Sequence, residues 1–597
     1  MADLKAGPAI TTADSEAPTI AGSTTSLSEK ARSLRDDGAS ERIERTDGTQ
    51  QYNTDSDEKH HDLTHQQTAT SHGGKEHSLR PTSTREDGTE YPKGMQLVLI
   101  NVALCMAVFL MSLDNAIIAT AIPKITDQFN SLADVGWYGS AYMLTTAALQ
   151  LLFGRLYTFF NIKWMYLTAI GFFELGSLIC GVAPTSTALI VGRAIAGIGA
   201  AGLFSGSLII LAHSVPLDKR PIYTGLIGSM YGIASVSGPL LGGAFTDKVT
   251  WRWCFFINLP IGAVTVGVIT IFFKAPHSKK NTETWKERFW QLDPFGTAVF
   301  MPAIICLLLA LQWGGTEYAW DNWRIIFLFV MFGVLISIFL FDQHKQGPRA
   351  TVPPPIFFKR SVWSASFYSF SMGSAFMGAV FYLPIWFQAV KGASAVHSGI
   401  MNLPMLISVV IMSVIAGGVV TVIGYYSPFM IIGTVLASIG FGLITTFEPD
   451  TRAPIWIGYQ IIIGAGLGLG FQQPFIAVQT VLEMKDVPTG TSIITFMQTL
   501  GGALFVSVSQ NVFTNKLVQY VREYVPGLDP AVVLGTGATA IQHTIRPDQL
   551  AGVTQAYSDA LTQTFIVFVA MGTLSIVGAL VIEWKSVKGK KIEMAAA

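Results

Sequence analysis

Long apolar runs, separated by short polar segments, recur along the chain from Gln96 onward. Each run holds about twenty residues with almost no charge, which as a helix crosses roughly 30 Å of hydrocarbon. The pattern predicts about fourteen transmembrane helices, with ends uncertain by a few residues. They are expected near residues 97–120, 136–157, 164–183, 188–212, 222–245, 253–273, 295–313, 323–342, 363–388, 398–422, 427–447, 455–480, 489–513 and 563–583.

Residues 1–93 follow a different pattern. Ser, Thr, Asp, Glu, His and Gly dominate, apolar residues are sparse, and charges of both signs are mixed. Such a segment cannot bury enough apolar surface to fold, and it lacks the apolar stretch of a cleaved signal peptide. We expect a disordered cytosolic tail, with the first apolar span acting as its own insertion signal.

Lysine and arginine gather in the loops on one side of the predicted membrane. Arg155, Lys163 and Arg220 lie in such loops, and the tail at 584–597 is also basic. Because positive loops stay in the cytosol, both termini are expected there, and a long loop near 514–562 is expected outside. The plasma membrane is the expected location, although a vacuolar or vesicular membrane satisfies the same topology.

Composition agrees with a membrane protein. Half of the residues are hydrophobic, 13% are charged, and the mean hydropathy is +0.45, which is more apolar surface than a soluble protein of this size can hide. A net charge of zero gives no support for nucleic-acid binding. The four cysteines sit in apolar runs at spacings that match no metal or disulfide framework. No metal site and no cofactor is predicted.

Enzyme and ATPase signatures fail on inspection. The stretch GAGLGLG at 464–470 contains a dinucleotide-like glycine pattern, but it lies inside an apolar span and does not follow a strand. No Walker lysine follows any glycine cluster. The protein is therefore not expected to be an enzyme or an ATP-driven pump.

An internal repeat indicates two related halves. LIVGRAIAGIGAAGLFSG at 189–206 has a counterpart in IWIGYQIIIGAGLGLGFQQP at 455–474, and a Thr-Gly pair opens the following span in each case. Related halves are common in transporters. The predicted domains are a six-helix bundle at 97–273, two additional spans at 295–342 and a second six-helix bundle at 363–583. Glycine-rich spans also resemble each other by composition alone, which is the alternative.

Four motifs carry a family resemblance that covers residues 97–583. They are LDNAIIATAIPKI at 113–125, VGRAIAGIGAAG at 191–202, SVSGPLLGG at 235–243 and WRWCFFINLPIG at 251–262. With them the chain resembles the fourteen-span drug:proton antiporter branch of the major facilitator superfamily. LLFGRLYTFFNIKWMYL at 151–167 is similar to the fungal pumps that export toxins and other secondary metabolites.

This resemblance implies a monomeric exporter of a small organic molecule, driven by protons through alternating access. Two alternatives remain open. Relatives with fourteen spans include importers of compounds such as iron chelates, although the antiporter motif favours export. A non-transporting membrane receptor of the same fold is the second alternative, and the short C-terminal tail disfavours it. The substrate, and the choice between many drugs and one metabolite, stay open.

The loop after the second span departs from the family pattern. Gly154 and Lys163 remain, while the expected Asp, second Gly and first basic residue are replaced by Thr158, Asn161 and Ile162. The usual charged gate is therefore in doubt. We expect packing of Arg155 and Tyr157 with neighbouring phenylalanines to hold a cytosolic gate together with Gly154 and Lys163.

Glycines and a proline interrupt the fifth span. The antiporter motif contains Gly232, Gly238, Pro239, Gly242 and Gly243. Small residues let membrane helices approach closely, and proline removes one backbone hydrogen bond and bends the helix. A bent helix between two bundles is expected to seal the cavity against ions while the bundles rock. A packing helix with a tolerated proline is the alternative.

Charged residues inside the predicted membrane are costly and usually functional. Asp114 in the first span and Arg193 in the fourth are expected at similar depth, so the two can meet. They are the predicted proton-coupling pair, and a purely structural ion pair is the alternative. Glu174, in the middle of the third span, is expected to be a packing or neutral hydrogen-bonded carboxyl, with proton coupling as the less favoured reading.

Further polar and aromatic residues lie on spans expected to line a substrate cavity. They are the amides Gln150, Gln472, Gln473 and Gln498 and the aromatics Tyr231, Phe471 and Phe496. Amides donate and accept hydrogen bonds, and aromatic rings stack, which suits a neutral polar organic substrate. Ordinary packing is the alternative for each aromatic.

Overall fold

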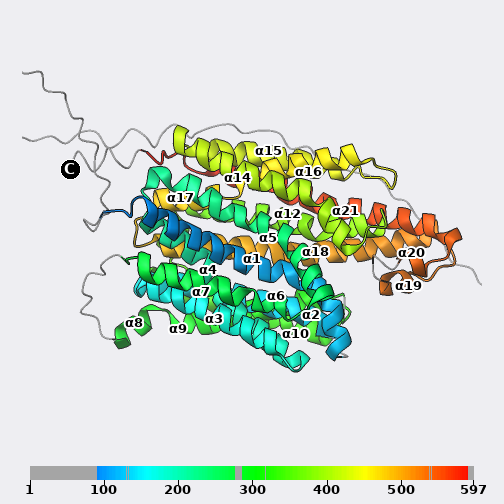
Figure 1. Ribbon diagram of the computed structural model, residues 1–597, viewed down its shortest axis with the longest axis horizontal. Helices are drawn as coiled ribbons and strands as arrows, with labels where there is room; N and C mark the ends of the chain where they lie inside the picture. The colour runs from blue at the N-terminus through cyan, green and yellow to red at the C-terminus, as the bar shows by residue number, and fades with distance from the viewer. Residues whose placement is uncertain are drawn as a thin grey trace, which may run out of the picture. The chain divides into compact units, whose positions relative to one another are not determined.

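The computed structural model describes residues 90–129, 131, 134–275, 285–315, 317–536, 538 and 541–588, and these are almost entirely helical. Within those ranges the only strand-like pairings are two isolated bridges, Gly314 with Tyr318 and Tyr425 with Ser586. The predicted tails at 1–93 and 584–597 lie largely outside the described residues. The predicted all-α class is confirmed (Figure 1).

Helices cover every predicted span. In the first part of the chain they are α1 (Met95–Phe129), α2 (Val135–Phe159), α3 (Ile162–Val182), α4 (Ser186–Ser214), α5 (Arg220–Lys248), α6 (Trp253–Phe256), α7 (Asn258–Phe272), α9 (Pro294–Trp313) and α10 (Trp323–Gln346). In the second part they are α12 (Arg360–Ala389), α13 (Ala395–Met401), α14 (Leu403–Ile423), α15 (Ser427–Ile444), α16 (Ala453–Gly470), α17 (Gln473–Val481), α18 (Val487–Tyr524) and α21 (Pro547–Val581). Short connecting helices are η2 (Leu217–Lys219), α8 (Trp285–Gln291), η3 (Gly347–Arg349), α11 (Pro354–Phe357), α19 (Pro530–Gly535) and α20 (Ile541–Thr544).

Twelve spans among the described residues are long and apolar enough to cross a membrane. The predicted number of fourteen is therefore not confirmed. The two remaining predicted spans coincide with α2 and α5, which are long helices but fall outside the twelve. Both contain many glycines and hydroxyl side chains, which lower their mean hydropathy.

Helical structure enters the predicted outer loop at 514–562 from both ends, because α18 continues to Tyr524 and α21 already begins at Pro547. The extension of α18 has its own apolar stripe, in which Phe513, Leu517 and Val521 are buried at helical spacing. Phe513 packs its ring 5.7 Å from that of Tyr557 on α21. Beyond the apolar run, α18 therefore continues as an amphipathic helix, with one apolar side that packs against the protein.

Glycines set the closest helix contacts in both halves of the chain. A methyl group on Gly176 of α3 would overlap the Ala196 backbone of α4. In the second half, a methyl group on Gly433 of α15 would lie 2.7 Å from the Gly466 carbonyl oxygen of α16. The third and fourth spans of each half thus pack through small residues.

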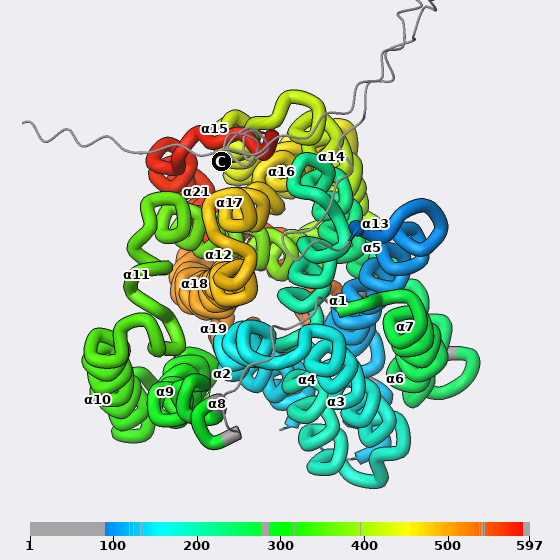
Figure 2. The backbone as a smooth tube through the Cα atoms, turned by 90° about the vertical axis from the view of Figure 1, so that its left-hand side faces the viewer, coloured from blue at the N-terminus to red at the C-terminus, as the bar shows by residue number. Residues whose placement is uncertain are grey.

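Two helix pairs make the most extensive contacts between the halves. α5 lies along α14, where Gly225 contacts the Ser413 backbone, and α2 lies along α18. Of the additional helices, α9 lies beside α2 and α18, and α10 packs on the outer side of α9 (Figure 2). Phe300 of α9 enters a buried apolar cluster with side chains of both α2 and α18. The additional pair therefore lies at the seam between the halves.

The α5–α14 contact makes a testable prediction through two adjacent glycines on α14. A methyl group on Gly417 would lie 2.5 Å from the Pro221 carbonyl oxygen, whereas a methyl group on Gly418 meets nothing within 4 Å. Gly417→Ala should destabilise the fold by about 1–3 kcal/mol through overpacking. Gly418→Ala, the matched control, should not lower the thermal midpoint in detergent. Equal midpoints for the two variants would contradict this close contact.

Candidate functional site

The structure brings Asp114 of α1 and Arg193 of α4 together in an ion pair. Both side chains are completely buried. Arg193 also donates a hydrogen bond from Nε to the Tyr138 carbonyl oxygen at 2.8 Å, and its guanidinium lies over the Tyr142 ring at 4.4 Å. These contacts fix one orientation of the guanidinium in a region without solvent.

A third polar residue, which sequence analysis did not single out, completes this site. Asn258 at the start of α7 donates from Nδ2 to Asp114 Oδ1 at 3.1 Å and to Ser177 Oγ of α3 at 3.0 Å. The site therefore joins α1, α3, α4 and α7. Asn258 lies in the quoted WRWCFFINLPIG motif, and a buried amide in an apolar segment was the available signal.

The antiporter motif of α5 lies between α1 and the α13–α14 segment. Methyl groups on Gly238 and Gly242 would overlap Ala116 and Ile117 of α1, while a methyl group on Gly232 would overlap Val410 of α14. Pro239 faces Gly399, and Gly243 has only Val396 nearby. Three of these five positions thus make close contacts, two with α1 and one with α14.

The predicted cavity amides have unpartnered carbonyl oxygens. Gln150, Gln472, Gln473 and Gln498 each contain a buried Oε1 without a hydrogen-bond partner among the described residues. Gln472 and Gln473 lie where α16 ends and α17 begins, because Pro474 cannot donate a backbone hydrogen bond to continue α16. Gln472 also lies against Gly228 of α5.

The predicted aromatics go to three places. Tyr231 of α5 and Phe475 of α17 each lie edge-on to Phe204 of α4, with ring centroids 5.5 Å apart. Phe471 packs 5.1 Å from Phe376 of α12. Phe496 packs 5.3 Å from Phe300 of α9, in the apolar cluster at the seam rather than beside the amides of α16 and α17.

The predicted gate residues do not act as one cluster. Gly154 of α2 lies against Ser492 of α18, because a methyl group on the glycine would be 2.6 Å from the serine Cβ. Tyr157 instead donates a 3.0 Å hydrogen bond to the Gly202 carbonyl oxygen of α4. Lys163 donates to the Thr270 carbonyl oxygen of α7 at 2.6 Å. Tyr157 and Lys163 therefore stabilise contacts within the first half of the chain.

A hydroxyl pair, which sequence analysis missed, joins the halves at the same end of α2. Thr158 Oγ1 and Thr489 Oγ1 of α18 lie 3.2 Å apart in a hydrogen bond. Thr158 occupies the position where the family pattern has aspartate. The threonine in place of the aspartate was thus the feature of the sequence that could have indicated this contact.

Arg155 binds the segments that flank the additional helices. Its Nη2 donates to the carbonyl oxygens of Gln291 at 2.7 Å and Arg349 at 2.9 Å, and its guanidinium lies over the Phe159 ring at 4.6 Å. Gln291 ends α8, and Arg349 follows α10. Arg155 therefore attaches the α9–α10 pair to α2.

Asp293 organises the same region from the other side. It is fully buried, adopts a left-handed backbone with φ of 51°, and caps α9 by accepting from Gly296 N at 2.8 Å. It also accepts from Gln343 at 2.7 Å, Gln346 at 2.6 Å and the Thr351 backbone and hydroxyl. Burial raises the pKa of Asp293. These hydrogen bonds together lower the pKa by more than burial raises it, so the pKa lies below the usual aspartate value.

A separate aromatic pocket opens where α11 meets α12 and α18. Its volume is about 400 Å³. The lining includes Phe357, Trp363, Phe370 and Met497. The aromatic run at 357–370 was its signal in the sequence.

The sequence profile of the Major Facilitator Superfamily matches residues 104–506 of this chain. The chain belongs to the Major Facilitator Superfamily. This family assignment confirms the predicted one, and the protein is a multi-pass membrane transporter for small molecules.

Two fungal relatives of the superfamily are similar over most of their length. "MFS-type efflux pump MFS1" of Arthroderma benhamiae is 62% identical over 505 residues, covering 84% of this chain and 94% of that protein. "Efflux pump roqT" of Penicillium rubens is 54% identical over 492 residues, covering 82% of this chain and 91% of that protein.

Two solved superfamily structures share the fold. The human organic anion transporter MFSD10 superposes with a TM-score of 0.51 at 12% identity, covering 80% of this chain and all of that one. The proton:xylose symporter XylE superposes with a TM-score of 0.53 at 13% identity, covering 81% and 94%. At this identity the likeness concerns the fold alone.

The cluster around Asp293 makes the second prediction. Asp293→Asn removes the charge that its hydrogen-bond donors stabilise, and should lower the free energy of unfolding by about 2–3 kcal/mol at pH 7. Because the pKa of Asp293 is lowered in the fold, this stabilisation is complete above the ordinary aspartate pKa of about 3.9 and is lost as pH falls through the native value. Thermal unfolding in detergent at pH 7 and pH 4.5 should show the same deficit.

Asp321→Asn in the exposed connection between α9 and α10 is the matched control and should leave stability unchanged. An Asp293→Asn variant as stable as this control would show that Asp293 does not hold the additional helices in place.

Proposed function

We propose that the protein exports a small organic molecule in exchange for protons, by alternating access. The observation that carries the coupling is the fully buried Asp114–Arg193 pair with its Asn258 contact. A protonated Asp114 no longer balances the Arg193 charge, so proton uptake destabilises this arrangement of α1, α4 and α7. The direction rests on the similarity to two fungal proteins called efflux pumps.

The cargo we infer is a secondary metabolite, toxin or drug with hydrogen-bond donors and an apolar body. The four unpartnered oxygens of Gln150, Gln472, Gln473 and Gln498 are acceptors without donors. Their hydrogen bonds would become satisfied when such a molecule binds. Aromatic side chains near them, such as Phe471 and Tyr231, suit its apolar part.

Alternating access requires contacts that open on one side at a time. At the end of α2, Gly154 against Ser492 and Thr158 against Thr489 are short-range contacts between the halves. Uncharged contacts of this kind separate without exposing an unpaired charge. We propose that they form the cytosolic gate, while Arg155 holds the additional helices.

We further propose that the protein works as a monomer in the plasma membrane with both termini in the cytosol. The basic loops support the orientation. The division at 97–273, 295–342 and 363–583, with the segment 514–562 outside, is the domain organisation we propose to go with it.

The coupling role predicts the behaviour of Asp114→Asn. This variant keeps the size of the side chain but removes the exchangeable proton, so export should fall at least tenfold. Untargeted comparison of small molecules inside and outside cells that express wild type, variant or neither protein measures this. Asp114→Glu, which retains a carboxyl, should keep part of the export.

The amount of Asp114→Asn protein at the membrane is the necessary control, because a buried Arg193 without its partner is destabilising. Export at wild-type level with normal protein abundance would mean that Asp114 carries no coupled proton.

The gate predicts a difference between two glycines of α2. Gly154→Val introduces atoms where Ser492 lies, so the halves should not close at this end and export should fall several-fold. Gly139→Val, where a methyl group meets nothing within 4 Å, is the matched control and should export normally. Thr489→Cys is then added to each variant, and its reaction with an impermeant maleimide applied from the cytosolic side is measured. The cysteine should react faster in the Gly154→Val background than in the otherwise wild-type protein, and no faster in the Gly139→Val background.

A further inference from the structure

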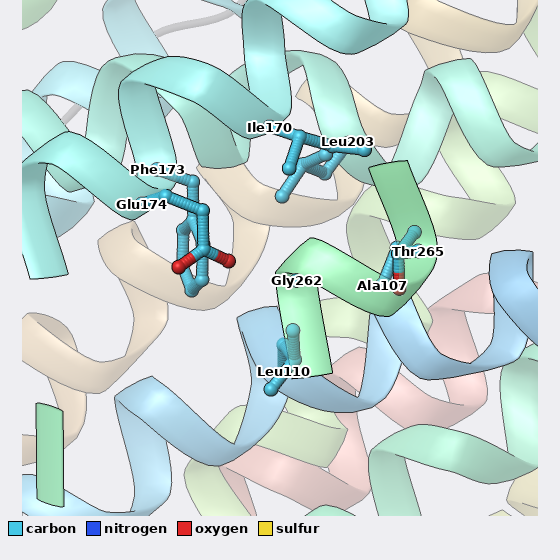
Figure 3. Close-up of a pocket in the computed structure, with 8 residues that line it drawn as sticks. All are labelled: Ala107, Leu110, Ile170, Phe173, Glu174, Leu203, Gly262 and Thr265. Atoms are coloured by element: carbon cyan, nitrogen blue, oxygen red, sulfur yellow. The ribbon is translucent and has the colours of Figure 1, made fainter. Parts of the chain in front are cut away.

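Glu174 of α3 lies in a small pocket between α1, α3, α4 and α7. Figure 3 shows its carboxyl among the pocket-lining side chains, on the side where α7 carries Gly262. The other lining residues are Ala107, Leu110, Ile170, Phe173, Leu203 and Thr265. The space has no room for a water molecule. Glu174 as a whole is half-buried, and none of the other residues that line this pocket is charged.

Both carboxyl oxygens of Glu174 are buried and have no hydrogen-bond partner among the residues that the structure describes. Gly262 provides the space for them, because a methyl group there would overlap Oε1. An ionised carboxylate without partner or water costs several kcal/mol in such surroundings. The neutral, protonated form is the one that fits this arrangement.

Few ionisable side chains surround this pocket. Within about two helical turns of its lining they are Cys105, Asp114, Lys163, Tyr166, Cys180 and Cys254. Along α7 there is no ionisable side chain, and α4 contributes only the more distant Arg193 and His213, which lie toward its two ends. Lys163 binds the Thr270 carbonyl oxygen, and Asp114 binds Arg193. No cation is thus left to pair with Glu174.

A chain of hydrogen-bonded polar side chains, formed by Ser177, Asn258 and Asp114, begins one helical turn away from Glu174. Ser177 follows it by three residues on α3, and Asn258 precedes Gly262 by one turn on α7. Asn258 binds both Ser177 and Asp114, while its Oδ1 is a buried acceptor without a donor. An unpartnered carboxyl on α3 and an unpartnered amide oxygen one turn along α7 from Gly262 therefore lie on packed helices next to the ion pair.

We propose that Glu174 is a second proton-binding site, which holds a proton in this conformation while Arg193 keeps Asp114 ionised. When the ion pair opens, the Glu174 proton passes to Asp114 as the Ser177 and Asn258 side chains between them rearrange. Glu174 becomes a carboxylate, Asp114 becomes a carboxylic acid, and no further reactant is needed. The idea rests on proton-coupled export, because it supplies the proton that such coupling requires.

Infrared spectroscopy of the purified protein tests the proton directly, without knowledge of the cargo. At pH 7 the wild type should show the C=O stretching band of a protonated carboxyl, and this band should disappear as pH rises. Glu174→Gln should lack it. Glu448→Gln, the same change at an exposed loop position, and Asp114→Asn should keep it. A band that persists in Glu174→Gln, or is absent from the wild type, would overturn the proposal.

Export in cells separates a proton carrier from a permanently neutral packing group. Glu174→Gln mimics the neutral form, so a packing role predicts normal export, whereas a carrier role predicts at least a tenfold loss at normal protein abundance. If Glu174→Gln folds poorly, Gly262→Ala displaces the carboxyl instead. Gly267→Ala on the same helix, where a methyl group meets nothing within 4 Å, is its control.

A protonophore distinguishes this inference from the function on which it rests. If collapsing the proton gradient leaves wild-type export unchanged, proton-coupled export itself is wrong. If wild-type export is sensitive to the protonophore but Glu174→Gln exports normally, only the role of Glu174 is wrong.

Discussion

The structure depends on an ion pair that is buried where water does not reach. Asp114 and Arg193 are each fully buried, so each charge is tolerated only while the other is in place. Asn258, the Tyr138 carbonyl oxygen and the Tyr142 ring add further contacts, and together they hold α1, α2, α4 and α7 in one arrangement. A proton delivered to this site changes the stability of that whole arrangement.

Elsewhere the interfaces that a moving transporter must rearrange are built from small, uncharged contacts. Gly154 lies against Ser492, Thr158 bonds to Thr489, and Gly225 lies against the backbone of Ser413. Such contacts are close and specific, yet separating them leaves no charge unpaired. The Asp114–Arg193 pair lies instead within the first half and the Asp293 cluster on the additional helices, while the buried Arg220 reaches across to the Met484 sulfur.

The additional helices illustrate this division. Asp293 binds side chains and backbone that follow α10, and Arg155 binds carbonyl oxygens on both sides of the pair. In the family pattern this region contains a charged gate between transmembrane helices. Here the arginine faces the additional pair, and a threonine forms the contact between the halves. The same end of α2 therefore anchors α9 and α10 and contacts α18.

The sequence showed the apolar runs of membrane length, the four family motifs and the similar depth of Asp114 and Arg193. It could do so because span length, glycine spacing and the cost of a buried charge are local properties. The family, the all-α fold and the helix positions followed from them. The count of fourteen spans is not confirmed, because α2 and α5, with their many glycines and hydroxyl side chains, fall outside the twelve helices that are apolar enough to cross a membrane.

Only the tertiary structure decided the partners. Several contacts join residues that are far apart in the chain: Asn258 with Asp114, Thr158 with Thr489, and Phe496 with α9. Such pairings depend on how each helix is rotated about its own axis. The same holds for Glu174, whose apolar pocket exists only because Gly262 of another helix makes room for the carboxyl.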